Sequence, residues 1–322
     1  MTDLTSHYAI VVNFIRDGKL VPFLGAGANR CGRKGSPFGP TVAPPDGKEL
    51  SRYLADKWGY DASQGDPEDL VRVAQYIAVH IDETTLYEEL RKLFDVDYPT
   101  NPLHRLLAGL PALLREKAGV PHNQVVVTTN YDDLLERAFA QAGEQFDVFT
   151  YRNLSEGEQG RFWHLAPGVT EAVPVESAND YKGLELDADG ELLHPAILKI
   201  HGAINRANED EDSYVITEDH YIEYLTRTDL AELLPKPILA RLLNSHLLFL
   251  GYSLRDWNFR AILYYIYHHR LHDNDWWAVL LKPDRLERKS WLKRHVAIVD
   301  IALEAYIPAL KKAFLAELST VA

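Results

Sequence analysis

The stretch Leu20-Val21-Pro22-Phe23-Leu24-Gly25-Ala26-Gly27-Ala28-Asn29 decides the fold of this chain. Its apolar first half predicts a central strand of a parallel sheet, because such strands are covered on both faces. Gly25 and Gly27 follow at once. Glycine there lets the backbone approach an anionic ligand, toward which the next helix directs its amino end. The stretch therefore predicts a strand that ends in a phosphate-binding turn for a nucleotide.

Taken alone, this turn is equally compatible with an ordinary tight turn, since glycine serves any such turn. Arg30 stands where the common dinucleotide fingerprint has a third glycine, and no Gly-Lys-Ser/Thr of a Walker motif follows. The Gly- and Pro-rich segment 34–47 comes next and is longer than most connections. We expect this segment to sit over the nucleotide, and other strand ends must decide between the two interpretations.

Composition limits the classes of protein to which the chain can belong. Its 322 residues are 46% hydrophobic and 25% charged, which is typical of a globular protein with a sizeable core. The net charge is −13 and no basic run is longer than 292–295, so direct nucleic-acid binding is not expected. The single cysteine, Cys31, excludes an internal disulfide and a multi-thiolate zinc site.

No secretion signal and no apolar run of about 18 residues is present in the sequence. The lone cysteine also suits a reducing compartment. We therefore predict a cytoplasmic protein that is not bound to a membrane.

Short apolar and β-branched runs recur along the chain and alternate with helical patterns. After the first strand, the expected strands with the residues that end them cover 124–133, 196–202, 246–253, 277–281 and 296–299. Strands that alternate with helices predict an α/β fold, in which a Rossmann-like, mostly parallel sheet carries helices on both faces.

One block of the chain is helical throughout, from residue 48 to about residue 117. Its clearest helix start is Asp66-Pro67-Glu68-Asp69, with a capping acid and a proline in the first turn. We therefore assign residues 1–47 and 118–322 to the Rossmann-like domain, and residues 48–117 to a helical insertion. Two polar stretches, 153–160 and 205–212, are expected to be surface loops.

Glycines and polar residues follow four of the expected strands. In an open parallel sheet, ligands bind beyond the carboxyl ends of the strands, so residues placed there share one crevice. The four sets are Gly25-Ala26-Gly27 with Asn29, Asn130-Tyr131-Asp132, His201-Gly202 and Gly251-Tyr252-Ser253. The sequence thus predicts one ligand site that is built from segments far apart in the chain.

In this order, the four sets resemble the catalytic core of the sirtuins, over residues from about 20 to 260. Sirtuins have a Gly-Ala-Gly turn, a Thr-Gln-Asn-Ile-Asp element, a catalytic histidine after a strand, and a Gly-Thr/Tyr-Ser element. The resemblance implies that the segment Gly25, Ala26, Gly27 holds a pyrophosphate. It implies that Asn130 and Asp132 border the nicotinamide and its ribose, and that His201 acts as a base.

The remaining residues of the implied NAD-binding set are Asn29, Gly251, Tyr252 and Ser253, of which Ser253 would contact the adenosine side. Two features of sirtuin deacylases are missing. One cysteine cannot build their four-cysteine zinc module, and the loop around 38–40 replaces their Gly-Ile-Pro-Asp-Phe-Arg segment.

The chain is more similar to the sirtuin-like domains of bacterial antiphage defence proteins, which hydrolyse NAD; residues 250–256 resemble their closing motif. This resemblance implies an NAD+ hydrolase that depletes NAD in antiphage defence by abortive infection, with NAD as the substrate and no metal. It further implies a homo-oligomer that is controlled by its assembly or by a partner, a HerA-type ATPase.

The residue types suit cleavage of the nicotinamide–ribose bond, which passes through an oxocarbenium-like state. Such a reaction needs a grip on the leaving group, a placed water and a group that manages a proton. Asn130 can orient water or an amide, Asp132 can stabilise positive charge or bind a hydroxyl, and His201 titrates near neutral pH. Without a channel for an acyl-lysine, water is the default nucleophile.

Each of these residues also has a structural alternative. A histidine at a strand end is often structural, Asn130 and Asp132 can cap the helix that follows them, and the pair 255–256 can form a salt bridge at a helix start. Two other functions therefore stay open. One is a non-catalytic sensor of NAD or ADP-ribose, and the other is a zinc-free, sirtuin-type protein deacylase.

Overall fold

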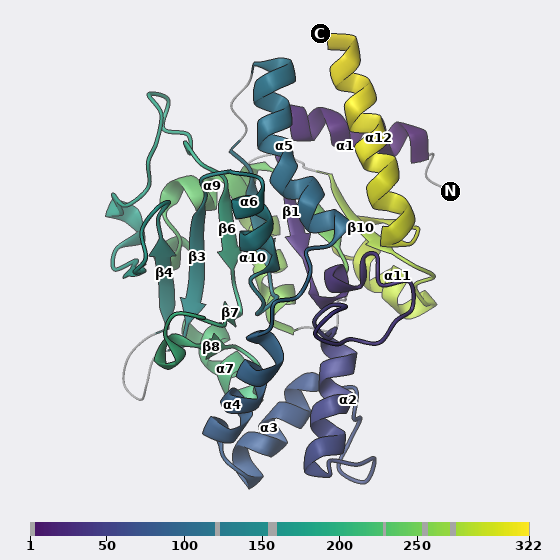
Figure 1. Ribbon diagram of the computed structural model, residues 1–322, viewed down its shortest axis with the longest axis vertical. Helices are drawn as coiled ribbons and strands as arrows, with labels where there is room; N and C mark the ends of the chain where they lie inside the picture. The colour runs from purple at the N-terminus through teal and green to yellow at the C-terminus, as the bar shows by residue number, and fades with distance from the viewer. Residues whose placement is uncertain are drawn as a thin grey trace.

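A sheet in the order β11-β10-β9-β1-β2-β6-β3-β4-β5 forms the centre of the molecule (Figure 1). The computed structural model describes residues 4–119, 123–153, 160–227, 230–252, 257–270 and 275–321. The strands of this sheet are β1 (Leu20–Leu24), β2 (Val125–Thr128), β3 (Asp147–Arg152), β4 (Arg161–Leu165), β5 (Val173–Pro174), β6 (Ala196–Lys199), β9 (His246–Leu250), β10 (Trp276–Leu280) and β11 (Val296–Asp300).

The strand β1 lies in the middle of the sheet and pairs in parallel with β9 on one side and β2 on the other. Phe23 stands opposite Phe249 in β9 and Val127 in β2. Parallel pairing continues through β10 and β11 at one end, and through β6 and β3 at the other. Only β4 and β5 join by antiparallel pairing within the described sheet. The predicted α/β fold with a mostly parallel, Rossmann-like sheet is confirmed.

The direction in which the chain winds through the sheet changes at β1. From β1 the chain crosses to β2 on one side, whereas β9 on the other side is followed by β10 and β11. In open α/β sheets, ligands bind outside the carboxyl ends of the strands at such a switch point. The topology therefore places the expected crevice between the ends of β1 and β9.

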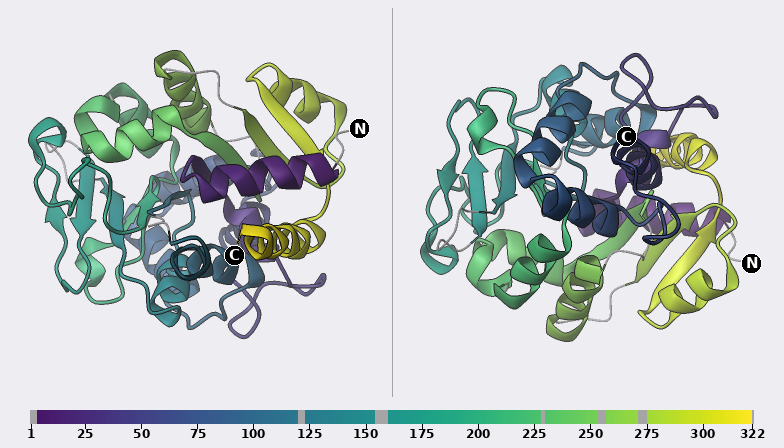
Figure 2. Two further views of the ribbon diagram at one scale, coloured as in Figure 1. Left: turned by 90° about the horizontal axis from the view of Figure 1, so that it is seen from above. Right: turned by 90° about the horizontal axis from the view of Figure 1, so that it is seen from below.

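Two layers of helices cover the sheet, one on each face (Figure 2). The first layer comprises α1 (Leu4–Arg16), α5 (Pro102–Ala118), α6 (Leu134–Gln141) and α12 (Leu303–Val321); their buried side chains cluster with Leu20 and Leu24. The second comprises α7 (Glu218–Arg227), α8 (Leu230–Leu233), α9 (Lys236–Asn244), α10 (Trp257–His269) and α11 (Arg285–Leu292), which cluster with Val21 and Phe23. Successive residues of a strand point to opposite faces, so each β1 residue is buried under one layer.

None of the described helices is long and apolar enough to cross a bilayer.

The helices α2 (Gly47–Trp58), α3 (Leu70–His80) and α4 (Glu83–Phe94) lie beyond the carboxyl ends of the parallel strands, at the bottom of Figure 1. They have a separate cluster of buried residues, to which Tyr131 and Tyr214 of the sheet domain contribute. The fourth helix of the predicted insertion, α5, instead buries leucines against the sheet. The division into 1–47 with 118–322 and 48–117 stays a prediction.

The connection before α3 differs in detail from the expected helix start. Asp69, not Asp66, caps α3, because its side chain accepts a hydrogen bond from the Arg72 amide. Asp66 instead accepts from the Glu68 amide in the preceding turn. Of the two predicted surface loops, 205–212 includes the short helix η3 (Glu209–Glu211). Residues 154–159 of the other loop lie outside the described residues.

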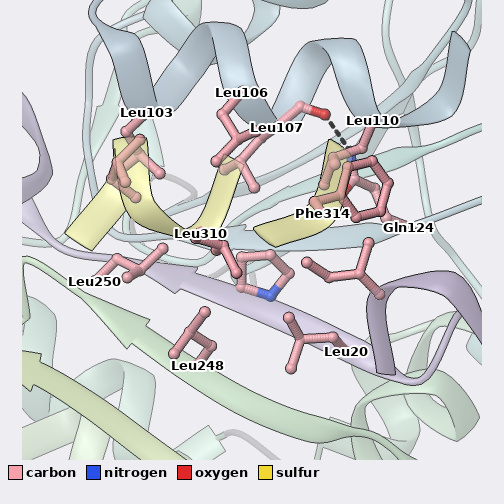
Figure 3. Close-up of a pocket in the computed structure, with 13 residues that line it drawn as sticks. Leu20, Leu103, Leu106, Leu107, Leu110, Gln124, Leu248, Leu250, Leu310 and Phe314 are labelled. Atoms are coloured by element: carbon pink, nitrogen blue, oxygen red, sulfur yellow. Dashed lines mark hydrogen bonds between the residues drawn. The ribbon is translucent and has the colours of Figure 1, made fainter. Parts of the chain in front are cut away.

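A small apolar cavity of about 20 Å³ lies between α5, α12 and the sheet (Figure 3). Leucines from these elements and Phe314 line it. Its polar lining residue, Gln124, donates a hydrogen bond to the Leu107 carbonyl over 2.6 Å. This volume holds about one water molecule, so the cavity is a packing defect in the core and not a ligand site.

Acid should destabilise the fold through two buried histidines. Burial lowers the pKa of His7 and of His104 to about 4, while the unfolded chain titrates near pH 6.5. Between these values only the unfolded chain takes up the protons, so stability falls as the pH drops from about 6.5 to 4. Between pH 7 and pH 5, we expect the free energy of unfolding to fall by about 2 kcal/mol less in His104→Gln than in the wild type.

Urea unfolding at both pH values measures this difference. His268→Gln, at an exposed position, is the matched control and should behave as the wild type does. An equal fall of the free energy of unfolding in the wild type and in His104→Gln would contradict the role of His104 in the loss of stability in acid.

Candidate active site

A cleft of about 970 Å³ opens at the carboxyl ends of β1, β2, β6 and β9. The predicted site residues that the structure describes all line it: Gly25, Ala26, Gly27, Asn29, Asn130, Asp132, His201, Gly251 and Tyr252. The remaining one, Ser253, lies outside the described residues. Segments from four strand ends, up to about 225 positions apart in the chain, thus share one cleft, as the rule for open parallel sheets requires.

The opposite wall of the cleft comes from segments that the sequence did not connect with the site. Residues 45–48, where the predicted 34–47 loop leads into α2, line it together with residues 66 and 68–69 before α3 and residues 70–71 in the first turn of α3. The helix α7 adds Tyr221, Ile222 and Leu225. Figure 1 shows α2, α3 and α7 on the side of the sheet toward which the parallel strands point.

The glycine turn after β1 packs directly on the turn after β9. The Gly27 amide donates to the Gly251 carbonyl over 2.9 Å, and the Gly25 amide donates to the Leu250 carbonyl over 3.1 Å. A Cβ atom at Gly25 or Gly27 would lie 2.6 or 2.7 Å from the Gly251 oxygen. The sequence attributes these glycines to a ligand, but the contact between the two turns by itself requires them.

The element after the turn is also shorter than expected. It is the 3-10 helix η1 (Ala26–Arg30), of five residues. The first long helix after the turn is α2, whose amino end lines the same cleft but is already capped by Asp46 and Glu49. The described backbone therefore presents no long helix starting at the glycine turn.

Asn29, Asn130 and Asp132 form one buried hydrogen-bonded cluster. Asn29 Nδ2 donates to Asp132 Oδ2 over 2.8 Å, and Asn130 Nδ2 donates to Asn29 Oδ1 over 3.5 Å. Asp132 Oδ1 accepts from the Leu134 amide at the start of α6. Asp133 is the N-cap residue of α6 and has no side-chain cap. Asp132 serves the helix start from one position earlier, and its carboxylate takes part in the cluster as well.

His201 follows β6 and is held from two directions. Its imidazole meets the Tyr221 and Tyr224 rings edge-on, with centroids 5.7 and 6.3 Å apart. The next residue, Gly202, has φ +81°, and a Cβ there would lie 2.1 Å from the Ser213 oxygen. This turn leads into the small sheet of β7 (Gly202–Ala203) and β8 (Ser213–Tyr214). The hairpin thereby fixes the backbone that carries His201.

Lys199 is a residue of the site that was not predicted, although the sequence holds a signal for it. Lys199 is buried at the end of β6, where its ammonium donates to the Asp132 carbonyl and to the Glu136 carboxylate. Burial raises the pKa of Glu136, and the Lys199 charge opposes that rise. A lysine inside an otherwise apolar strand run is rare unless it is paired, so its position pointed to a buried partner.

The charges that line the cleft are mostly negative. Its two described cations, Arg30 and Lys48, are each paired with a carboxylate, Asp46 at 3.1 Å and Glu68 at 2.7 Å. Among the residues that the structure describes, no three His, Cys, Asp or Glu side chains gather in a way that could hold a metal ion. The cleft thus offers backbone amides, amide and carboxylate oxygens and one imidazole for binding and proton transfer.

The close contact between the two turns predicts that a side chain at Gly251 destabilises the fold more than a side chain at a glycine with similar φ and open surroundings. Gly251 has φ +65°, and a Cβ there would lie 2.1 Å from the Ala28 nitrogen. Gly59 has φ +69° and open space around its Cβ position. We expect Gly59→Ala to lower the free energy of unfolding by about 1 kcal/mol and Gly251→Ala by at least about 3 kcal/mol. Urea denaturation measures both, and equal losses would show that the turns do not need their close contact.

Comparison with known proteins gives a family and two informative relatives. A family model described as "SIR2-like domain" matches residues 124–299, which is more than half of the chain. Defense-associated sirtuin 2 of Bacillus subtilis is 27% identical over 254 residues, which cover 78% of this chain. NAD(+) hydrolase ThsA of Acinetobacter baumannii (strain 532279) is 26% identical over 265 residues, which cover 79% of this chain.

The chain spans only part of each of these relatives. The aligned region is 19% of Defense-associated sirtuin 2 and 44% of ThsA. A further match, 32% identical, to SAGA complex subunit Ngg1 of Schizosaccharomyces pombe covers 35% of this chain.

Proposed function

The chain belongs to the SIR2-like domain family, and on that premise we propose that it is an NAD+ hydrolase. The reaction would cleave the bond between nicotinamide and ribose and release nicotinamide and ADP-ribose. One observation carries the proposal: four strand-end segments far apart in the chain line a single cleft at the switch point of the sheet. Its volume of about 970 Å³ lies at the upper end of ordinary ligand sites, which suits a dinucleotide.

The polar groups of the cleft support a division of roles. The backbone of the segment 25–27 and the turn at Gly251 would lie along the pyrophosphate, although the Gly25 and Gly27 amides themselves donate to the Leu250 and Gly251 carbonyls. Asn130 and His201 would border the nicotinamide and its ribose. Asp132 belongs to the same group of predicted catalytic residues.

The chemical step needs few groups. The nicotinamide leaves with the electron pair of the C1′–N bond, and positive charge develops on the ribose. A water molecule attacks C1′ and loses a proton, which His201 can accept because an imidazole titrates near neutral pH. Asn130 would orient that water or a ribose hydroxyl. No metal is required in this scheme.

The relatives' names support a role in defence. One is called a defence-associated sirtuin and the other an NAD(+) hydrolase. We propose that this chain depletes NAD during phage infection. A hydrolase that is always active would harm its own cell, so we also propose control by assembly, as a homo-oligomer or through a HerA-type ATPase, for which the support is the family resemblance.

Removal of the proton acceptor or of the orienting amide should abolish NAD cleavage. We expect His201→Ala and Asn130→Ala to lower nicotinamide release by on the order of 100-fold or more, because a positioned acid or base contributes about that factor. Chromatography of nicotinamide and ADP-ribose measures it, for the protein alone and with its genomic neighbour. His268→Ala, a substitution of an exposed histidine, should leave the rate unchanged.

The same assay separates the alternatives. Unchanged cleavage in folded His201→Ala and Asn130→Ala would show that the roles are wrong. NAD binding without turnover in the wild type would favour the sensor. Consumption of NAD only in the presence of an acylated peptide would favour the deacylase.

Control by assembly has a separate test. We expect native mass spectrometry to give a homo-oligomer, and NAD cleavage to depend on that oligomer or on an added HerA-type ATPase. A monomer that cleaves NAD at full rate without a partner would contradict this part of the proposal.

A further inference from the structure

The geometry points to Asn29 and Asp132 as positioning residues, which together orient the amide of Asn130 so that its oxygen is the group that meets the substrate. This inference rests on the proposed NAD hydrolysis in the same cleft. It changes the part expected for two residues: Asn29 would not bind the dinucleotide through its side chain, and Asp132 would not touch the reacting ribose.

Both ends of the Asn29 side-chain amide are hydrogen-bonded within the protein. Its Nδ2 donates to Asp132 Oδ2, and its Oδ1 accepts from Asn130 Nδ2. Asn29 is only 2% exposed. A side-chain amide that donates in one direction and accepts in the other can link two neighbours in only one orientation.

The carboxylate of Asp132 is engaged at both oxygens. Oδ2 accepts from Asn29, and Oδ1 accepts from the Leu134 amide over 3.1 Å. The carbonyl of the same residue accepts from the buried Lys199 ammonium. Asp132 is therefore held through side chain and backbone together, and its position is set by the strand β6 as well as by its own turn.

Asn130 is the member of the cluster that has an atom left for a ligand. Its Nδ2 is directed to Asn29, and its backbone amide donates to Thr128 Oγ1 over 3.0 Å. Its Oδ1 is buried and has no hydrogen-bond partner within the part of the chain that the structure describes. The residue is 7% exposed and lines the cleft.

A buried amide oxygen without a partner is unfavourable unless a ligand or a water supplies a donor. The group that reaches Asn130 Oδ1 must therefore be a hydrogen-bond donor. The attacking water, a ribose hydroxyl and the carboxamide NH₂ of nicotinamide all meet this requirement, whereas a phosphate oxygen does not.

The backbone beneath the cluster is fixed by other elements. Asn101, which caps α5, donates from Nδ2 to the Ala28 carbonyl over 2.9 Å. The Cys31 amide donates to the same oxygen over 3.1 Å. The turn that carries Asn29 is thus attached to α5, and the orientation of Asn130 depends on β1, β2, β6 and α5 together.

An exchange of the two side chains tests the inference. In the double variant Asn29→Asp with Asp132→Asn, the carboxylate moves to position 29, where it would accept from Asn130 Nδ2 and from the new amide at position 132. The oxygen of that new amide would accept from the Leu134 amide. All three hydrogen bonds of the wild type are restored with the same net charge. Asn29→Asp alone places two carboxylates against each other. Asp132→Asn alone keeps its hydrogen bonds only if the amides of Asn29 and Asn130 turn over, which replaces the Asn130 oxygen in the cleft by its NH₂ group.

We expect each single variant to lower kcat for nicotinamide release by about 30-fold or more with little change in the KM for NAD. The double variant should return to within about threefold of the wild type, since the interaction between contacting residues is not additive. Asn208→Asp, on an exposed residue away from the cleft, is the control and should not rescue Asp132→Asn. A double variant as slow as Asp132→Asn would overturn the inference, because a carboxylate at position 132 would then act on the substrate itself.

A second readout separates this inference from the proposed function. Urea unfolding of the wild type, the two single variants and the double variant should show that Asn29→Asp is destabilised and that the double variant regains most of that loss. If the wild type cleaves no NAD under any condition, the proposed function fails while this restored stability still supports the hydrogen-bonded cluster. If the changes in the free energy of unfolding of the two single variants simply add up in the double variant, the hydrogen-bonded cluster is overturned, whether or not the protein is a hydrolase.

Discussion

The rest of the structure depends on the close contact between the turns that end β1 and β9. The Gly27 amide donates to the Gly251 carbonyl, and a Cβ atom at either position would collide with the opposite backbone. These turns lie at the point where the winding of the sheet changes direction. Because no side chains separate them, the two strand ends form one continuous backbone floor for the cleft, on which a ligand can lie close to the main chain.

The polar cluster above this floor explains why the site has a defined geometry. Asn29, Asn130 and Asp132 exchange hydrogen bonds in a buried environment, where such bonds are strong and a missing partner is costly. Tyr131, the residue between Asn130 and Asp132, belongs to the buried cluster of α2, α3 and α4 and meets the ring of Phe94 in α4. Its hydroxyl donates to the Val215 carbonyl over 2.9 Å. These helices are therefore connected to the same short segment that carries the proposed catalytic amide.

The central strands that the sequence predicted and the strands β3 and β4 that it missed differ in how apolar their residues are. The runs that became β1, β2, β6 and β9 are apolar almost throughout, because both faces of these central strands are covered. The missed strands β3 and β4 lie toward one edge of the sheet. β4 alternates buried and partly exposed residues, and polar side chains such as His164 interrupt its apolar pattern. His164 is nevertheless buried, where it forms a hydrogen bond with Asp147 in β3. No local pattern in the sequence indicates this pairing.

By itself, the sequence determined the α/β class, the central strands and the four strand-end segments that share the cleft. These follow from local hydrophobic patterns and from the rule that parallel strands end at one edge of the sheet. Only the tertiary structure decided which atoms face a ligand. Asn29 and Asp132 are 103 positions apart and engage each other, and Lys199 holds the Asp132 carbonyl from another strand. The direction of a hydrogen bond depends on where both partners lie in space, and no pattern along one segment contains that information.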